Sequence, residues 1–364
     1  MYDIILSFLT AFLLTYFAIP SIIHVAKKKH LTDDPGERTS HSESTPSLGG
    51  IGIFAGVLFS IIFWTPFGVF ADLQYILCSF IIIFLIGAKD DILPIDPTKK
   101  LIGQIVATLI LIFKSNVKLT SFYGVFGVGL LPEWVAVVFS CFVILVIINA
   151  FNLIDGINGL TGTIASLISL TLGFWFLMVD QIELAIVGFA LSGALIAFLK
   201  YNITPSRIFM GDTGSLLVGI ICAILAIKFI EVHKEVKDSV YAFPAAPAMA
   251  VAILIIPLFD TLRVFTMRII RGRSPFKPDR NHIHHLLIDS GNSHMQATGI
   301  LLLVNIGFIL LGWSLQGLGN LNLLIILVGL ATLLTAVLFF NVRRKRIKAA
   351  VAVVEEKEKV ESLP

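Results

Sequence analysis

Aspartates at the ends of apolar segments are the residues in this chain whose type and spacing best suit chemistry. Asp90 and Asp91 are adjacent, whereas Asp155 and Asp212 stand in glycine-containing stretches where apolar segments end or begin. Adjacent carboxylates repel each other, and a nearby cation or a phosphate-bound metal stabilises the pair. Each aspartate could instead cap a helix or face solvent, and capping does not exclude metal binding. These four aspartates are therefore candidate catalytic residues.

Hard oxygen donors without nearby thiols predict Mg²⁺, with Mn²⁺ as a substitute, in preference to zinc. The chain has three cysteines, and all of them fall inside apolar runs. Magnesium usually takes only one or two protein oxygens and leaves its other positions to water and substrate phosphate. Asn152 and Asp212 would therefore be enough, and we predict the metal site at this pair.

The stretch DRNHIHH, residues 279–285, combines an arginine with three histidines. Arg280 can hold a phosphate through two parallel hydrogen bonds, whereas histidine donates without carrying a full charge. We interpret the stretch as an anion clamp formed by Arg280, His282, His284 and His285. A solvated basic loop is the alternative, and a zinc site would need further ligands at a suitable spacing.

The stretch NAFNLIDGINGLTG, residues 149–162, follows one of the most apolar runs of the chain. It concentrates asparagine, aspartate and glycine where a helix leaving a bilayer would usually carry basic or aromatic residues. A glycine-rich helix end with polar caps would explain it structurally. A loop that binds a substrate would explain it functionally, and the stretch alone does not decide between the two.

The composition predicts the elements that must position these residues. The chain has 364 residues, of which 57% are hydrophobic and 14% charged, whereas a soluble domain carries about 25% charged residues. Because a run of about 20 apolar residues can cross a bilayer, we predict an all-α polytopic membrane protein. Hydropathy gives about eleven transmembrane helices, at residues 4–26, 48–66, 72–88, 101–113, 132–151, 160–179, 182–200, 214–230, 247–269, 296–316 and 321–341.

Basic residues predict the orientation of these helices. One set of alternate connectors holds most lysines and arginines, including those at 27–29 and 343–348. The positive-inside rule makes this set cytoplasmic, so the N-terminus lies outside and the C-terminus inside. The candidate chemical residues all fall on the cytoplasmic side. We expect residues 1–341 to form a single integral-membrane domain with catalytic cytoplasmic loops, and residues 342–364 a basic, then acidic, cytoplasmic tail.

Four motifs, taken together and in this order, resemble the polyprenyl-phosphate N-acetylhexosamine-1-phosphate transferases of glycosyltransferase family 4. They are KDDILPIDPTKKLIGQ (89–104), NAFNLIDGINGL (149–160), RIFMGDTGSLLVG (207–219) and PDRNHIHHLL (278–287). The family includes the MraY, WecA and TagO enzymes. The MraY branch carries three consecutive histidines, so HIHH after PDRN, with STPSLGG near the N-terminus, is more similar to the WecA/TagO branch.

The resemblance implies transfer of a sugar-1-phosphate from a UDP-sugar to undecaprenyl phosphate, with release of UMP. We expect the group transferred to be N-acetylglucosamine-1-phosphate. This would form the first lipid-linked intermediate of a cell-envelope polysaccharide such as O-antigen or teichoic acid. Asn152 and Asp212 would then bind Mg²⁺, and Asp90 and Asp91 would lie at the end that holds the lipid phosphate.

The remaining roles also follow from the resemblance. Lys100 would hold phosphate, Asp155 would organise its loop, Asn158 would reach the nucleotide, and the Arg280 and histidine cluster would hold diphosphate or sugar. Bacterial relatives commonly have aspartate where this chain has Asn158. The loop of this chain therefore has one carboxylate fewer.

Three alternatives stay open at this stage. They are a phospho-N-acetylmuramoyl-pentapeptide transferase, a membrane prenyltransferase with Asp-rich motifs and Mg²⁺, and a transporter, although a transporter would place its polar residues near mid-membrane. We expect a multi-pass protein of the bacterial inner membrane that acts on UDP-N-acetylhexosamine and polyprenyl phosphate among membrane lipids. We expect no nucleic acid partner, and a homodimer is compatible with the resemblance.

Overall fold

A computed structural model describes residues 2–32, 45–69, 73–272 and 281–361, with side chains up to residue 347. The described residues form α-helices and short 3-10 turns, and no strand longer than an isolated bridge occurs among them. This confirms the all-α prediction. The helices are α1 (Tyr2–Lys28), α2 (Gly49–Trp64), α3 (Leu73–Ile92), α4 (Pro97–Lys114), α5 (Glu133–Ile154), α6 (Leu160–Met178), α7 (Ile182–Asn202), α8 (Gly211–Val232), α9 (Ala246–Ile253), α10 (Ile255–Ile270), α11 (Ile283–Asp289), α12 (His294–Leu315) and α13 (Asn320–Glu361).

Every apolar segment predicted to span the membrane is helical. Seven helices are long and apolar enough to cross a bilayer, and the bent pair α9–α10 would raise that number to eight. The other predicted spans correspond to α2, α3 and α4, with 16, 20 and 18 residues. The structure therefore supports a multi-pass membrane protein, while the count of eleven spans stays a prediction.

The ninth predicted span is the one that the structure breaks. Its two halves, α9 and α10, meet at Leu254 with a bend of 83°. Pro257 has no backbone N–H, so the carbonyl of Ile253 cannot receive the helical bond that this position would normally supply. The side-chain amide of Asn305, fully buried in α12, donates to that carbonyl at 3.1 Å instead. The break is thus satisfied by a specific partner from another helix.

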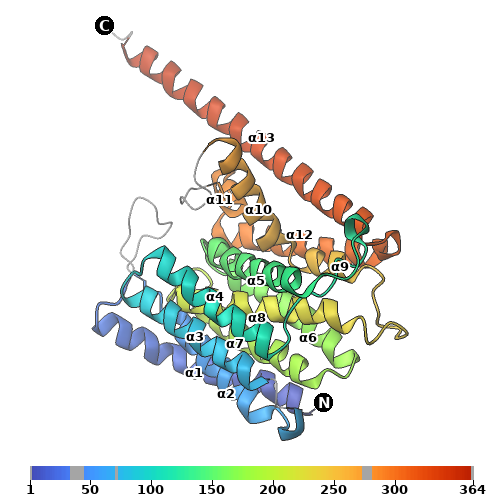
Figure 1. Ribbon diagram of the computed structural model, residues 1–364. Coiled ribbons are helices and arrows are strands. Elements are labelled where there is room, and N and C mark those ends of the chain that lie inside the picture. The colour runs from blue at the N-terminus through green and yellow to red at the C-terminus, as the bar shows by residue number, and fades with distance from the viewer. Residues whose placement is uncertain (1, 33–44, 70–72, 273–280, 362–364) are drawn as a thin grey trace.

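Helix α8 forms the centre of the bundle, and almost every residue along it is buried. It packs against α2, α3, α5, α6, α7 and α9, and Figure 1 shows α1–α4 on one side of it and α12 and α13 on the other. A Cβ atom at Gly219 would lie 2.7 Å from the Cα atom of Ile148 in α5. The missing side chain allows these two helices to approach at backbone distance.

The start of α8 is held tightly between the ends of two other helices. The backbone N–H groups of Gly49 and Gly50 donate to the carbonyls of Phe209 and Met210, both at 2.9 Å. A Cβ atom at Gly87, near the end of α3, would lie 2.5 Å from the Cα atom of Thr213. The start of α2, the end of α3 and the start of α8 therefore form one compact unit, which positions Asp212.

Candidate functional site

Four of the predicted site residues meet at one end of the bundle, although they come from four different helices. The ammonium group of Lys100 in α4 lies 3.0 Å from Oδ2 of Asp90 in α3 and also pairs with Oδ2 of Asp212 in α8. Oδ1 of Asp212 accepts a hydrogen bond of 2.6 Å from the side-chain amide of Asn152 in α5. Lys100 thus bridges two carboxylates that are 112 and 10 residues away from it in the chain.

The turn between α3 and α4 explains how Asp90 and Lys100 come together. Oδ1 of Asp90 accepts from the backbone N–H of Ile95 at 2.8 Å. Asp96 caps α4 by accepting from the backbone N–H of Thr98 at 2.8 Å, and Pro97 occupies the first helical position, where its missing N–H costs nothing. This turn places Lys100 at the end of the first turn of α4, facing back toward Asp90.

The pKa values of this pair follow from its surroundings. Burial raises the pKa of Asp90, but hydrogen bonds with Asp212, from the N–H of Ile95 and from Lys100 outweigh it and lower the pKa to about 2. Burial lowers the pKa of Lys100, but the Asp212 and Asp90 carboxylates outweigh this effect and raise it. Both groups are therefore charged at neutral pH.

Asp91 has a different role in the structure from its neighbour Asp90. Its oxygens accept from the backbone N–H groups of Asp212 at 2.7 Å and Thr213 at 2.9 Å, and from the Thr213 hydroxyl. The first turn of a helix leaves its N–H groups without helical partners, so Asp91 caps α8 from another helix. Gly211 has a φ of +71° and would carry a Cβ 2.7 Å from Asp91 Oδ2, so the turn into α8 requires glycine.

The loop after α5 carries Asp155 and Asn158, and it contacts a second part of the chain. Burial raises the pKa of Asp155 to about 7, and the nearby charges of Asp212 and Asp91 act in the same direction. Asn158 donates to the Thr204 hydroxyl at 3.1 Å, and its carbonyl accepts from Thr298 in α12 at 3.0 Å.

Two further partners of this loop were missed by the sequence analysis. The backbone N–H of Gly159 donates to Oδ1 of Asn202 at 2.7 Å, and Asn202 also donates to the carbonyl of Ile208 at 2.9 Å. The hydroxyl of Ser215 accepts from the side-chain amide of Asn152 at 3.0 Å. Ser215 follows Asp212 by three residues in a helix, a spacing that could have indicated a shared face.

The histidine stretch is organised by Asp260. Asp260 and Arg263 stand one helical turn apart, a spacing that predicts an ion pair, and the two side chains lie 2.9 Å apart. Asp260 also accepts from the backbone N–H of Ile283 at 2.9 Å and contacts Nδ1 of His282 at 2.9 Å. His282 is therefore anchored to a buried carboxylate. Arg280 lies outside the described residues.

His284 connects this stretch to the loop after α5. A Cβ atom at Gly156 would lie only 2.4 Å from Nε2 of His284. Glycine is needed at position 156 because the imidazole occupies the space that a side chain would take. The sequence did not indicate this contact. His285 lies beside His284, with 4.2 Å between the ring centroids.

The electrostatic state of His284 differs from that of a surface histidine. Its side chain is 1% exposed, and burial, helped by the neighbouring His285, lowers its pKa to about 3. Its Nε2 atom has no hydrogen-bond partner among the described residues. A neutral imidazole with a free nitrogen, set against the loop after α5, can donate to or accept from a polar ligand.

The donor set at the carboxylates suits a hard cation. Asp90, Asp212 and Asn152 offer oxygen atoms and no thiol, and hard divalent cations prefer oxygen. The Asp212 side chain is 29% exposed, so a ligand can reach it. No group of three or more histidine, cysteine or acidic side chains with metal-binding geometry occurs within the described ranges. A site here would therefore rely on few protein ligands, as magnesium sites often do.

The fold and the site define a polytopic membrane enzyme with a charged cluster at one end of the bundle. The sequence model of glycosyl transferase family 4 matches residues 73–230. The chain is 32% identical over 307 residues to the undecaprenyl-phosphate alpha-N-acetylglucosaminyl 1-phosphate transferase of Escherichia coli O157:H7. The aligned region covers 81% of this chain and 78% of that protein. The chain is 27% identical over 315 residues to the decaprenyl-phosphate N-acetylglucosaminephosphotransferase of Mycobacterium tuberculosis (strain CDC 1551 / Oshkosh), with coverage of 81% and 78%.

The chain belongs to glycosyl transferase family 4, among the polyprenyl-phosphate N-acetylhexosamine-1-phosphate transferases, and it is an enzyme. The resemblance seen in the four motifs is thereby confirmed. The matched residues 73–230 include Asp90, Lys100, Asn152 and Asp212, whereas the histidine stretch lies beyond them.

Proposed function

We propose that this enzyme transfers N-acetylglucosamine-1-phosphate from UDP-N-acetylglucosamine to undecaprenyl phosphate and releases UMP. An oxygen of the lipid phosphate attacks the phosphorus that bears the sugar, a new P–O–P bond forms, and the bond to the UMP phosphate breaks. The product is the first lipid-linked intermediate of a cell-envelope polysaccharide. The relatives in Escherichia coli and Mycobacterium tuberculosis carry names that describe the same type of transfer.

The observation that carries this proposal is the bridge of Lys100 between Asp90 and Asp212. Two anionic substrates must approach each other in this reaction, so the protein has to neutralise charge where they meet. The four polar groups come from four helices and meet at one point, which structural capping alone would not require. Lys100 is well placed to transfer its contacts from a carboxylate to a substrate phosphate.

Magnesium fits the same cluster. Asn152 and Asp212 would hold the ion, and Mn²⁺ would substitute for it, because both ions accept oxygen ligands. The side-chain amide of Asn152 now donates to Asp212, and rotation of the amide by half a turn would present its oxygen instead. A bound Mg²⁺ would act as a Lewis acid and would neutralise negative charge on the diphosphate of the UDP-sugar.

The structure favours Asp90 over Asp91 as the carboxylate next to the lipid phosphate. Both oxygens of Asp91 accept hydrogen bonds at the start of α8, so Asp91 acts by positioning Asp212. A phosphate monoester has a second pKa of about 6 and is largely ionised at neutral pH. Direct attack by the lipid phosphate therefore needs no strong base and no covalent aspartyl intermediate.

The other end of the donor would lie toward the histidine stretch. His284 stands against Gly156 in the loop that also carries Asn158. His282, His284 and His285 would contact the diphosphate or sugar together with Arg280, while Asn158 would reach the nucleotide and Asp155 would organise the loop. Nε2 of His284, which is buried and has no partner among the described residues, supports this assignment.

The proposal includes a location. The protein would span the bacterial inner membrane eleven times, with its N-terminus outside and its C-terminus inside. Asp90, Lys100, Asn152 and Asp212, here called the carboxylate cluster, would lie on the cytoplasmic face, where UDP-sugars occur. Residues 1–341 would form the transferase domain, and residues 342–364 the tail. The distribution of lysine and arginine supports this orientation.

Purified protein in detergent, supplied with undecaprenyl phosphate, Mg²⁺ and a panel of UDP-sugars, tests the proposal through UMP release. We expect release with UDP-N-acetylglucosamine, loss of release on chelation, and recovery with Mn²⁺. Asp212→Asn should lower turnover by about 10²-fold or more while the protein stays folded. Release with another UDP-N-acetylhexosamine alone would keep the reaction and change the donor, and folded protein without release from any donor would contradict the proposal.

A further inference from the structure

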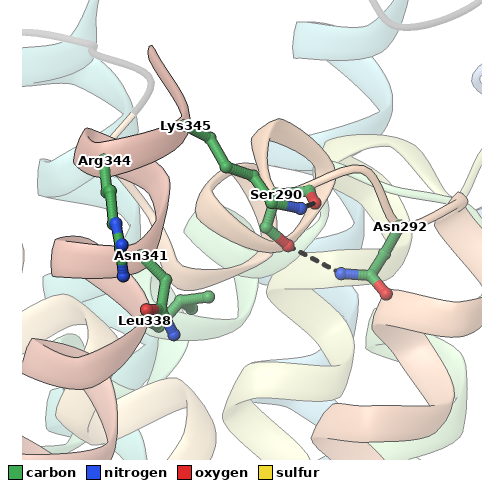
Figure 2. Close-up of a pocket in the computed structure, with 6 residues that line it drawn as sticks. All are labelled: Ser290, Asn292, Leu338, Asn341, Arg344 and Lys345. Atoms are coloured by element: carbon green, nitrogen blue, oxygen red, sulfur yellow. Dashed lines mark hydrogen bonds between the residues drawn. The ribbon is translucent and has the colours of Figure 1, made fainter. Parts of the chain in front are cut away.

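A polar cavity lies away from the carboxylate cluster, between the α11–α12 connection and α13. Its volume is about 580 Å³, and it is lined by Ser290, Asn292, Leu338, Asn341, Arg344 and Lys345. Figure 2 shows Leu338, Asn341 and Arg344 on α13, facing Ser290 and Asn292 across the cavity. None of these residues has a hydrogen bond or ion pair with the four residues of the carboxylate cluster in the described structure.

The cavity carries net positive charge and several hydrogen-bonding groups. Arg344 and Lys345 contribute two cations, and none of the described residues that line the cavity has a carboxylate. The ammonium group of Lys345 donates to the carbonyl of Ser290 at 2.5 Å, and Asn292 donates to the Ser290 hydroxyl at 2.7 Å. Asp289, the acidic residue next to Ser290, is paired with Arg346 outside the lining. The cavity therefore suits an anion.

An apolar cavity adjoins the polar one at Leu338, which lines both. This second cavity has a volume of about 200 Å³ and lies between α10, α11, α12 and α13. Its lining includes Phe259, Leu287, Val304 and Leu334, and among the described residues that line it only Thr335 has a polar side chain. From Lys345 to Ala331 the two cavities follow α13 for roughly 21 Å, at 1.5 Å per residue. This is the pattern of a charged head followed by an apolar tail.

We propose that these joined cavities bind an anionic membrane phospholipid. Its phosphate would contact Arg344 and Lys345, its polar headgroup the side chains of Asn292 and Asn341, and an acyl chain the apolar cavity beyond Leu338. Basic groups between membrane helices attract anionic headgroups in this way. A soluble anion would use the cations but leave the apolar cavity empty, so the combination of both cavities favours a lipid.

The lipid site is joined to the catalytic end through α11. This helix carries His284 at its beginning and leads into Ser290 at its end. A bound headgroup therefore fixes the end of the helix that positions His284 against Gly156. The inference does not depend on which UDP-sugar the enzyme uses, since binding is measured without turnover.

Binding of phosphatidylglycerol to the full-length protein in detergent tests the inference, by native mass spectrometry and by the shift in Tm. Arg344→Gln with Lys345→Gln should weaken phosphatidylglycerol binding tenfold or more and abolish the rise in Tm. Arg343→Gln is the matched control, because Arg343 is exposed and does not line the cavity, and it should stay within twofold of wild type. Leu338→Trp keeps both cations, fills the junction and should weaken binding similarly, which also decides the question if the double variant does not fold.

Four results would overturn the inference. If the double variant and Arg343→Gln bind phosphatidylglycerol equally well, Arg344 and Lys345 do not contact the lipid. If wild type binds phosphatidylcholine as well as phosphatidylglycerol, the site has no preference for an anionic headgroup. Glycerol phosphate that raises Tm as much as the phospholipid would show a site for a free anion. Displacement of phosphatidylglycerol by undecaprenyl phosphate, with a higher KM for that substrate in the double variant, would assign the cavities to the lipid substrate.

Discussion

At the scale of single residues, the net charge of the site depends on Lys100, which forms ion pairs with two carboxylates. Two carboxylates, Asp90 and Asp212, share one ammonium group, which offsets one of their two negative charges. A cation or an anionic substrate that enters must change these contacts. We therefore propose two roles for Lys100, as a stabilising ion pair and as a contact for a substrate phosphate.

Lys100→Met tests this dual role, with Lys99→Met as the matched control. Lys99 is the preceding residue and is exposed, so its loss should leave turnover within about twofold, as is usual for an exposed surface residue. We expect Lys100→Met to lower kcat/KM by about 10²-fold, because it removes a charge contact where the phosphates meet. UMP release measures both variants. Unchanged kcat/KM in Lys100→Met would restrict Lys100 to a structural ion pair.

His284 predicts a particular dependence of stability on pH. Burial lowers its pKa to about 3, whereas a histidine in the unfolded chain titrates near 6.5. The unfolded state therefore binds a proton that the folded state does not, and stability is lost as the pH falls from about 6.5 toward 3. We expect Tm in detergent to fall less steeply over this range in His284→Gln than in wild type. Parallel Tm curves would show that the imidazole is not held neutral.

At the scale of elements, the ends of α2, α3 and α8 explain the position of Asp212. Asp91 accepts the first N–H groups of α8 from outside that helix, and the glycines at 50, 87 and 211 allow the close approach. Substitutions of Asp91 and of Asp212 should therefore affect stability and turnover differently. Asp91 holds the start of α8, whereas Asp212 is proposed to face the substrate.

Asp91→Asn keeps one acceptor oxygen and places an amide N–H beside the N–H groups of α8. We expect a loss of stability of about 1 kcal/mol, typical for a damaged cap, together with lower turnover. Asp96→Asn is the control, because asparagine caps a helix as well as aspartate does, so its Tm and activity should stay near wild type. A variant at Asp91 that is inactive but keeps the wild-type Tm would indicate direct contact with substrate.

The sequence allowed most helices to be predicted, since apolar runs mark them whatever their partners are. The break at Leu254 was not predicted, because the apolar run continues through it and its stabilising donor, Asn305, comes from a distant helix. The pairing of Lys100 with Asp212 and the contact of His284 with Gly156 also join distant segments. Motif resemblance grouped these residues, but only the packing of the helices shows which atoms meet.

At the scale of the whole molecule, the bundle has chemically different ends. One end holds the carboxylate cluster and the histidine stretch. A second polar cluster centres on Glu231 at the end of α8, where it accepts from the backbone of Thr120 at 2.9 Å and from the hydroxyl of Tyr123 at 2.9 Å, and pairs with Lys234 at 2.8 Å. These contacts satisfy the hydrogen-bonding capacity of the Glu231 carboxylate within the protein, so we interpret this cluster as structural.

The orientation of the bundle is predicted from the distribution of its basic residues and can be tested in intact cells. Single cysteines are introduced into a cysteine-free background at Glu235, just after α8, and at Arg271, just after α10; Arg271 is exposed. Because basic residues favour the cytoplasmic side, a membrane-impermeant maleimide should label Glu235→Cys in intact cells. Arg271→Cys should be labelled only after the membrane is opened. The reverse pattern would place the carboxylate cluster outside, away from cytoplasmic UDP-sugars, and would contradict the proposed reaction together with the topology.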